Sequence, residues 1–204
     1  MYKLFIKRIL DIVISFTVLT LLSPVIVVVA LLLYISNNGK VFFLQQRPGR
    51  HERIFSIIKF KTMTDAKDHN DELLPDKDRL TTFGKLVRKA SLDEIPQIIN
   101  VLKGDMSLIG PRPLLLRYLP YYTEKERKRH DVLPGITGLA QVSGRNHLNW
   151  DQRLAKDLEY VENMSFSLDA KIFFQTIKNV LSSKDVAIDP QSLMLSLDEY
   201  RKKT

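Results

Sequence analysis

Residues 12–35 read IVISFTVLTLLSPVIVVVALLLYI, an apolar run broken only by scattered serine and threonine and one proline. As a straight helix rising about 1.5 Å per residue, this run would reach roughly 36 Å, which exceeds a hydrocarbon core about 30 Å thick. The run is longer than the apolar region of a cleaved signal peptide, and no small-x-small cleavage site follows it. We therefore expect a membrane segment near the N-terminus.

Ser23-Pro24 lies almost at the centre of this segment, where proline removes a backbone donor and kinks a helix. Positive residues flank the run on both sides: Lys3, Lys7 and Arg8 before it, and Lys40, Arg47, Arg50 and Arg53 after it. Because positive flanks mark the cytoplasmic side, a helix that bends at Ser23-Pro24 and returns would place both flanks there. A helix that spans the membrane with a tolerated proline is the alternative, and the residues alone leave both topologies open.

The whole chain has 204 residues, with 31 lysines and arginines against 23 acidic residues and a formal charge of +8. This excess suits nucleic acid, anionic lipid or a phosphorylated small molecule as a partner. The absence of cysteine excludes disulfides, thiolate nucleophiles and cysteine-ligated metals. Four scattered histidines show no metal-binding spacing and are expected to be ordinary surface or hydrogen-bonded residues.

The rest of the chain predicts short strands and several helices, and no other stretch is apolar enough to span a membrane. Strands are expected at 41–44 and 54–60, a polar surface loop at 64–80, two helical pieces within 83–104, a charged helical region at 115–131, a glycine-containing loop at 133–146, and helices at 150–163 and 169–183. The last of these helices is amphipathic, so it either packs on a core or lies in the membrane interface. Residues 184–204 are polar and are expected to be a mobile tail.

An acidic pair, Asp93-Glu94, opens one of the predicted helices. Helix capping is the simpler interpretation, because Ser91 and Glu94 match an S-x-x-E capping box and Asp93 could itself be the cap ahead of Pro96. A catalytic interpretation rests on the helical wheel, which groups Asp93 with Gln97 in a polar stripe. A carboxylate beside a helix N-terminus is held ionised, and so is available as a nucleophile or metal ligand.

Basic residues at rigid positions lie near this pair in the sequence. Lys59 and Lys61 alternate on a predicted strand and point to one face, and Arg88 precedes the acidic pair. The prolines of Pro111-Arg112-Pro113 restrict the backbone around the arginine, and Arg145 sits in a turn with Asn146. Each alone is a typical surface charge. Together they provide what phosphoryl transfer needs, because cations neutralise the phosphates and align the attack.

With these motifs assembled, the chain resembles the bacterial sugar transferase family, and within it the small monotopic polyprenyl-phosphate phosphoglycosyl transferases. The matching stretches are Lys7-Arg8-x-x-Asp11, Ser23-Pro24, QQRPG (45–49), KFKTM (59–63), FGKLVRKASLDEIPQIINVLKGDMSLIGPRP (83–113), PGITGLAQVSGRN (134–146), Asp157-x-x-Tyr160 and Leu168-Asp169. They cover nearly the whole chain to about residue 182.

The resemblance implies a mostly helical α+β fold with three parts: a re-entrant helix-break-helix in residues 1–36, a small cytosolic catalytic domain with interfacial amphipathic helices in 37–183, and the tail. It also implies location at the cytoplasmic face of a bacterial inner membrane. Lys7, Arg8, Ser23 and Pro24 would then belong to the membrane hairpin.

The same resemblance implies the chemistry. The aspartate that matches Asp93 attacks the β-phosphate of a UDP-sugar and releases UMP, and a polyprenyl phosphate, typically undecaprenyl phosphate, takes the phospho-sugar from the aspartate. Magnesium is required, with Asp93 and Glu94 as its expected ligands, and nucleic acid is not a partner. The pocket is expected to contain Lys59, Lys61, Arg88, Arg112, Arg145, Asn146 and Asp169. Two rival hypotheses are a metal-dependent glycosyltransferase that releases UDP and a basic, membrane-tethered binding protein without enzymatic activity.

Overall fold

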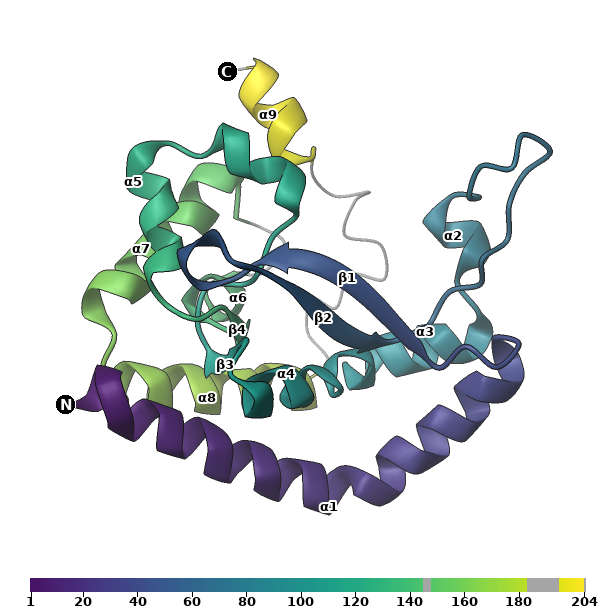
Figure 1. Ribbon diagram of the computed structural model, residues 1–204, viewed down its shortest axis with the longest axis horizontal. Coiled ribbons are helices and arrows are strands. Elements are labelled where there is room, and N and C mark those ends of the chain that lie inside the picture. Colours follow the sequence, from purple (N-terminus) through teal and green to yellow (C-terminus); the bar gives the residue numbers. More distant parts are fainter. Residues whose placement is uncertain (145–147, 183–194, 204) are drawn as a thin grey trace.

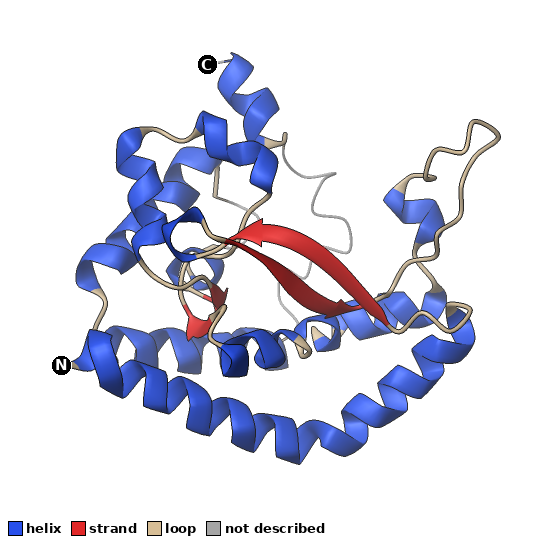
Figure 2. Ribbon diagram, viewed as in Figure 1, coloured by secondary structure: helices blue, strands red, loops and turns tan. Residues whose placement is uncertain are grey.

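The part of the chain that the structure describes is mostly helical and contains two small two-stranded sheets (Figures 1 and 2). A computed structural model describes residues 1–144, 148–182 and 195–203. The long apolar helix α1 lies along one side, and the helices and sheets of the remaining chain lie above it in Figure 1. The predicted class, mostly helical α+β with one long apolar helix at the N-terminus, is confirmed.

Helix α1 (Lys7–Ser36) follows a π-helical turn, η1 (Tyr2–Ile6), and is one continuous helix with Pro24 inside it. Figure 1 shows that α1 is bent near its middle. Pro24 has no N–H to donate to the carbonyl of Thr20, and the Ser23 hydroxyl donates to that carbonyl instead, at 2.8 Å. The predicted helix-break-helix is therefore a bend within one helix, because Ser23 keeps the freed carbonyl hydrogen-bonded.

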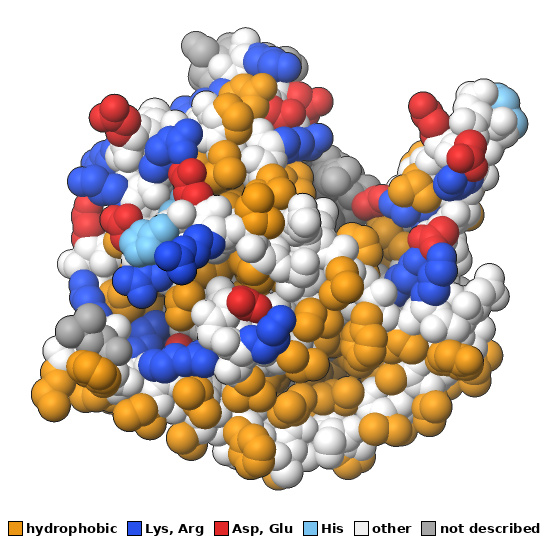
Figure 3. Space-filling view, viewed as in Figure 1, with side chains coloured by type: hydrophobic (Ala, Val, Ile, Leu, Met, Phe, Trp, Pro, Cys, Tyr) orange, Lys and Arg blue, Asp and Glu red, His pale blue; other side chains and the backbone are white. Residues whose placement is uncertain are grey.

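Most of the exposed side chains of α1 are apolar, as the orange lower edge of Figure 3 shows. Among the described residues, α1 is the one helix that is long and apolar enough to cross a membrane, with a mean hydropathy of 2.8 in its most apolar window. Only Asp11, Ser15, Val29 and Leu33 are buried in it.

The N-terminal end of α1 is tied to helices α8 and α4. The Lys7 ammonium lies 2.6 Å from the Asp169 carboxylate of α8. The Arg8 guanidinium donates to the carbonyl oxygens of Val101 and Leu102, at 2.6 and 3.0 Å, near the C-terminal end of α4. These contacts hold the start of the apolar helix against the body of the protein.

The C-terminal end of α1 packs on the same body. Leu33 is fully buried in a cluster with Phe60 and Val87. Directly after the helix, the Asn37 amide donates to the carbonyl of Lys61. Since both ends of α1 contact the rest of the chain, its bend points away from that body.

Two sheets support the loops of the body. Strand β1 (Phe42–Pro48) pairs antiparallel with β2 (Ile54–Phe60) across the 3₁₀ turn η2 (Arg50–Glu52). The strand predicted at 54–60 has its observed bounds, whereas the one predicted at 41–44 starts one residue later and continues to Pro48. Strand β3 (Ser107–Ile109) pairs in parallel with β4 (Gly135–Thr137). The second pair needs Gly135, because a Cβ there would lie 2.1 Å from the backbone nitrogen of Gly110.

The predicted helical pieces within 83–104 are α3 (Thr82–Lys89) and α4 (Gln97–Lys103), separated by the 3₁₀ turn η3 (Leu92–Glu94). The expected loop at 64–80 is irregular and ends in a short helix, α2 (Asp76–Arg79). The charged region 115–131 is broken into η4 (Leu116–Tyr121), α5 (Glu124–Arg127) and η5 (Lys128–Asp131), since Pro120 interrupts the first piece and Thr123 caps the second.

Helices α6 (Leu139–Val142), α7 (Trp150–Asn163) and α8 (Phe166–Leu181) complete the body. Helix α8 begins three residues earlier than predicted because the Ser165 side chain caps it. Ile172 on α8 is fully buried, whereas Phe174 is 69% exposed. One face of α8 therefore packs on the core and another carries exposed apolar side chains.

The C-terminal residues differ from the expected mobile tail. Leu197–Lys203 form helix α9, and Leu197 is fully buried in a cluster that includes Trp150. The Trp150 indole also donates to the carbonyl of Leu195, at 2.8 Å. The polar composition of this segment did not predict the contact. A single buried leucine and an ion pair between Arg201 and Glu126 hold the helix in place. Residues 183–194 and 204 lie outside the described residues.

Candidate active site

Asp93 and Glu94 lie on the 3₁₀ turn η3 and not inside a helix. Ser91 precedes them in the left-handed region, with φ 56° and ψ 20°, and its side chain makes no capping hydrogen bond. Helix α4 starts only at Gln97, after Pro96. The capping-box interpretation is therefore wrong for Ser91 and Glu94, and both carboxylates are available for other contacts.

Glu94 is held by two cations from separate elements. The Lys59 ammonium of β2 lies 2.6 Å from Glu94 Oε1. The Arg112 guanidinium also donates to Glu94 Oε1 and, at 3.3 Å, to Oε2. Although burial alone would raise the pKa of Glu94, the charges of Arg112 and Lys59 outweigh it and hold that pKa well below its usual range. Glu94 is thus ionised at all ordinary pH values, with both oxygens occupied.

Asp93 differs from its neighbour in having no direct partner. Within the described residues, no hydrogen bond or ion pair reaches the Asp93 carboxylate. Burial and the negative charge of Glu94 raise the pKa of Asp93 to about 6, against the weaker effects of Lys59, Arg88 and Arg112. The helix dipole therefore does not dominate, contrary to the sequence-based expectation. Asp93 is still mainly ionised at neutral pH, and its oxygens are free to react or bind.

Arg112 is positioned from behind by a buried ion pair. Arg129 donates from Nε and Nη2 to Asp157 Oδ2, at 3.1 and 2.7 Å, and both side chains are no more than 3% exposed. The same Arg129 Nη2 donates to the backbone carbonyl of Arg112, at 2.7 Å. The Arg129 guanidinium also lies over the ring of Tyr122. These contacts fix the backbone from which Arg112 reaches Glu94.

The other predicted cations divide between the site and its surroundings. Arg88 donates to the Thr62 hydroxyl, at 2.9 Å, and its charge lowers the pKa of Asp93, so it belongs to the site. Lys61 does not reach the acidic pair, because its ammonium lies 2.6 Å from Asp65. The expectation that Lys59 and Lys61 serve one site does not match the structure, because Lys59 contacts Glu94 whereas Lys61 contacts Asp65.

Asp169 was also expected in the pocket, but the structure places it at the N-terminal end of α1. Its carboxylate accepts hydrogen bonds from Tyr2, Lys7 and Tyr160. These contacts make Asp169 an anchor for the apolar helix. The predicted residues Arg145 and Asn146 lie outside the described residues.

Arg47 is a cation near the site that was not predicted to be a site residue. Arg47 on β1 has a pKa lowered to about 10, mainly by burial and secondly by the nearby charge of Arg112. Its Nε is buried without a hydrogen-bond partner. Among the described residues, Arg47 lies near Arg112 and forms no ion pair with a carboxylate. Its charge therefore adds to the positive potential that would attract an anion. The sequence feature that could have identified Arg47 is its position in the QQRPG motif.

The described residues offer a metal ion few ligands. They contain no group of three or more histidine, aspartate and glutamate side chains that could hold one. Glu94 is occupied by Lys59 and Arg112, which leaves Asp93 as a free carboxylate. Mg²⁺ commonly binds one or two carboxylates together with water and substrate phosphates. The site therefore fits a magnesium ion carried in with a phosphorylated substrate, and not a metal held by the protein alone.

Comparisons with known proteins show which family the sequence resembles. The model of the bacterial sugar transferase family matches residues 2–183. An uncharacterized sugar transferase, EpsL, of Bacillus subtilis (strain 168) is 48% identical over 180 residues, which cover 88% of this chain and 89% of that protein. UDP-glucose:undecaprenyl-phosphate glucose-1-phosphate transferase of Caulobacter vibrioides is 36% identical over 187 residues, covering 87% and 70%.

A third relative is larger than this chain. UDP-N-acetylgalactosamine-undecaprenyl-phosphate N-acetylgalactosaminephosphotransferase of Aeromonas hydrophila is 40% identical over 190 residues, which cover 87% of this chain but only 44% of that protein. The matched region therefore makes up less than half of that relative.

Proposed function

The chain belongs to the bacterial sugar transferase family, and on that basis we propose that it transfers a sugar phosphate from a UDP-sugar to a polyprenyl phosphate, at the first membrane step of glycan assembly. The family and the enzyme class expected from the motifs are both confirmed, which removes the hypothesis of a non-enzymatic binding protein. Several relatives are named as transferases of a sugar phosphate to undecaprenyl phosphate, and these names support the acceptor.

In the proposed first step, an oxygen of Asp93 attacks the phosphorus that carries the sugar. A bond forms between that phosphorus and Asp93, and the bond to the oxygen bridging the two phosphates breaks. UMP leaves with the bridging oxygen. Arg112, Lys59 and Arg88 supply positive charge beside the reacting phosphates.

In the second step, an oxygen of the polyprenyl phosphate attacks the same phosphorus. The bond to Asp93 breaks, the carboxylate is regenerated, and a diphosphate links sugar and lipid. No bond to the sugar carbon changes in either step, so the anomeric configuration of the donor is retained.

One observation carries this proposal: the two adjacent carboxylates have opposite environments. Glu94 is bound by Lys59 and Arg112, whereas Asp93 has a raised pKa and no direct partner among the residues that the structure describes. Glu94 is thereby suited to hold the two cations in place, and Asp93 is suited to attack. A tightly paired carboxylate would be a poor nucleophile, because its partners would have to be displaced first.

The test is a UMP-release assay across a panel of UDP-sugars with a polyprenyl phosphate acceptor. We expect UMP, a radiolabelled phospho-sugar trapped on the protein when acceptor is omitted, and loss of both in Asp93→Asn. Release of UDP without a trapped intermediate would contradict the proposed chemistry and favour the glycosyltransferase alternative. The same panel identifies the sugar.

Magnesium remains part of this proposal. When bound, Mg²⁺ would neutralise charge on the donor diphosphate, with Asp93 and Glu94 as the nearest carboxylates. Activity is expected to disappear with EDTA and to return with MgCl₂. Activity that persists in EDTA would contradict the requirement.

The membrane topology is proposed to be re-entrant at the cytoplasmic face of the inner membrane. Three observations support it: both ends of α1 contact the same body, its bend lies at Ser23-Pro24, and its outward side chains are apolar. The exposed apolar side chains of α8 would then lie in the interface. Because the chain lacks cysteine, Lys3→Cys and Arg50→Cys allow specific labelling. We expect both to label from the cytoplasmic side only, and labelling from opposite sides would establish a spanning helix instead.

A further inference from the structure

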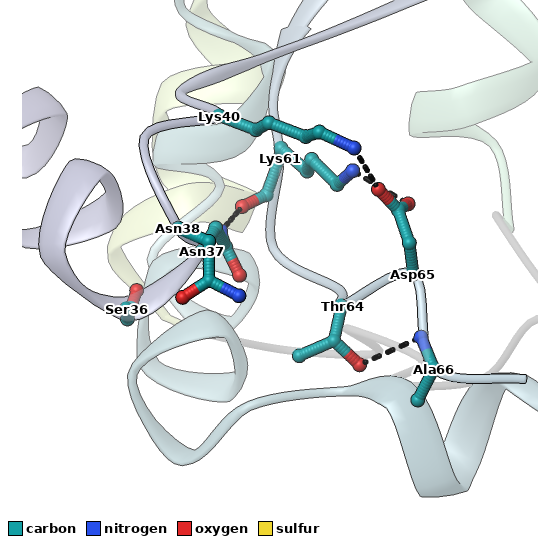
Figure 4. A pocket seen from close by; sticks show the side chains of 8 residues that line it. All are labelled: Ser36, Asn37, Asn38, Lys40, Lys61, Thr64, Asp65 and Ala66. Atoms are coloured by element: carbon teal, nitrogen blue, oxygen red, sulfur yellow. Dashed lines mark hydrogen bonds and ion pairs between the residues drawn. The ribbon is translucent and has the colours of Figure 1, made fainter.

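A polar pocket lies where the apolar helix α1 ends (Figure 4). It has a volume of about 410 Å³ and is open to solvent. Its walls come from the last residue of α1 and those that follow it, from the chain just after β2, and from the start of the loop at 64–80: Ser36, Asn37, Asn38, Lys40, Lys61, Thr64, Asp65 and Ala66.

Two lysines in this pocket share one carboxylate. Lys40 Nζ lies 2.7 Å from Asp65 Oδ2, and Lys61 Nζ lies 2.6 Å from Asp65 Oδ1, so each oxygen contacts one ammonium group. Figure 4 shows both lysine side chains pointing at Asp65. The three groups carry a net charge of +1. Asp65 therefore occupies the place that a phosphate would take between two ammonium groups.

The carboxylate that fills this place is paired with both lysines but is exposed to solvent. The Asp65 side chain is 48% exposed and that of Lys40 is 64% exposed, whereas that of Lys61 is only 12% exposed. Asp65 can thus turn outward into solvent, while Lys61 stays fixed in the pocket wall. An arriving anion would replace Asp65 on the lysines without unfolding anything.

Asn37 adds a second polar feature. This residue is 6% exposed, its amide nitrogen donates to the Lys61 carbonyl, and its Oδ1 is buried without any partner. A buried acceptor without a donor is costly and points to a missing partner. A ligand with an O–H group, such as a monoprotonated phosphate, would supply the donor.

The pocket adjoins the end of α1 and the end of β2, the strand that carries Lys59. Along the chain it begins at Ser36, directly after the exposed apolar side chains of Tyr34 and Ile35. Lys61 follows Lys59 by two residues, a separation of about 7 Å along extended chain. A lipid with its phosphate here would keep its hydrocarbon beside α1, and its phosphate would lie two residues along the chain from Lys59, the lysine that contacts Glu94.

We propose that this pocket is the docking site for the phosphate of the polyprenyl acceptor, with Lys40 and Lys61 as its cations and Asp65 as a carboxylate that the phosphate displaces. The inference rests on the proposed function, because it assigns a place to the second substrate. It also gives Lys61 a role apart from Lys59.

The experiment measures steady-state kinetics of the full chain in phosphatidylcholine vesicles, where polyprenyl phosphate is the only anionic lipid. Lys40→Gln removes one cation from an exposed position. We expect the KM for polyprenyl phosphate to rise roughly tenfold, the loss of one charged hydrogen bond, with kcat at saturating acceptor retained. Asp65→Asn removes the competing charge, so the KM for the acceptor is expected to fall.

Lys89→Gln is the matched control, because Lys89 is an exposed lysine on the neighbouring helix α3 and does not line the pocket. An unchanged acceptor KM in Lys40→Gln would overturn the proposal. So would an equal rise in Lys89→Gln, which would indicate general attraction to charge, or a rise in Asp65→Asn, which would make Asp65 structural. Failure of the proposed function is distinguishable, since the wild-type protein would then release no UMP.

Discussion

Lowering the pH through 6 should switch off the first chemical step, because Asp93 must be ionised to attack. Burial and Glu94 raise the pKa of Asp93 to about 6, against an ordinary value of 3.8. A carboxyl group with a pKa of about 6 is roughly tenfold less ionised at pH 5 than at neutral pH, whereas an ordinary aspartate would still be more than nine-tenths ionised. The rate of the donor step at pH 5 is therefore expected to be about one-tenth of its plateau.

The assay is single-turnover release of UMP from a UDP-sugar without acceptor. Omitting the acceptor matters, because a phosphate monoester also gains a proton near pH 6, whereas the donor diphosphate has no group that titrates in this range. Circular dichroism at each pH shows whether the fold persists. A rate at pH 5 within twofold of the plateau, with the fold intact, would refute the assignment of the raised pKa to the nucleophile.

Glu94→Gln provides an independent check of the cause. The negative charge of Glu94 is the second largest influence that raises the pKa of Asp93, and its removal also frees Lys59 and Arg112 to act on Asp93. The acid limb of the Glu94→Gln variant is therefore expected at lower pH than in the wild type, even though the maximal rate falls. A limb that stays at the same pH would mean that another group titrates.

The remaining predictions concern stability. Because the pKa of Asp93 in the folded protein lies above 3.8, its stabilising contribution is present below that pH and is lost as the pH rises through about 6. Asp93→Asn should therefore abolish turnover yet leave the melting temperature at pH 7.5 unchanged or higher. The difference between pKa values of 3.8 and about 6 limits the gain in the free energy of unfolding to about 3 kcal/mol. Asp157→Asn leaves Arg129 buried without its carboxylate, so the free energy of unfolding in denaturant titrations should fall by about 3–5 kcal/mol. Asp71→Asn, in the exposed ion pair with Lys67, is the control and should change it by no more than about 1 kcal/mol.

Local patterns in the sequence predicted the parts of the fold that depend on near neighbours. The strand at 54–60 was predicted with its observed bounds, because alternating branched and aromatic residues pack well on a two-stranded sheet. The helix at 150–163 was predicted as well, and Asn149 and Gln152 form its capping box. The importance of Arg112 followed from its flanking prolines.

Contacts between distant segments were not predictable in this way. Lys59 and Lys61 are equivalent by strand alternation, yet one contacts Glu94 and the other Asp65, because each meets a carboxylate from a different segment of the chain. The role of Asp169 depends on its contact with Lys7, a residue 162 positions away in the sequence. The left-handed backbone conformation of Ser91 could not be predicted from the sequence, because serine has no preference for it.

The division between Asp93 and Glu94 follows from geometry that neither residue determines alone. Successive residues on a tight turn point in different directions, so β2 and the segment of Arg112 reach Glu94 and leave Asp93 without a direct partner. The cations that Glu94 binds still lower the pKa of Asp93, but burial and Glu94 itself raise it further. Glu94 therefore does two things at once: it holds Lys59 and Arg112 near the place where phosphates would bind, and it keeps Asp93 close to its ionisation point. A phosphate that binds these cations would weaken their hold on Glu94, so donor binding and the charge on Asp93 are expected to be coupled.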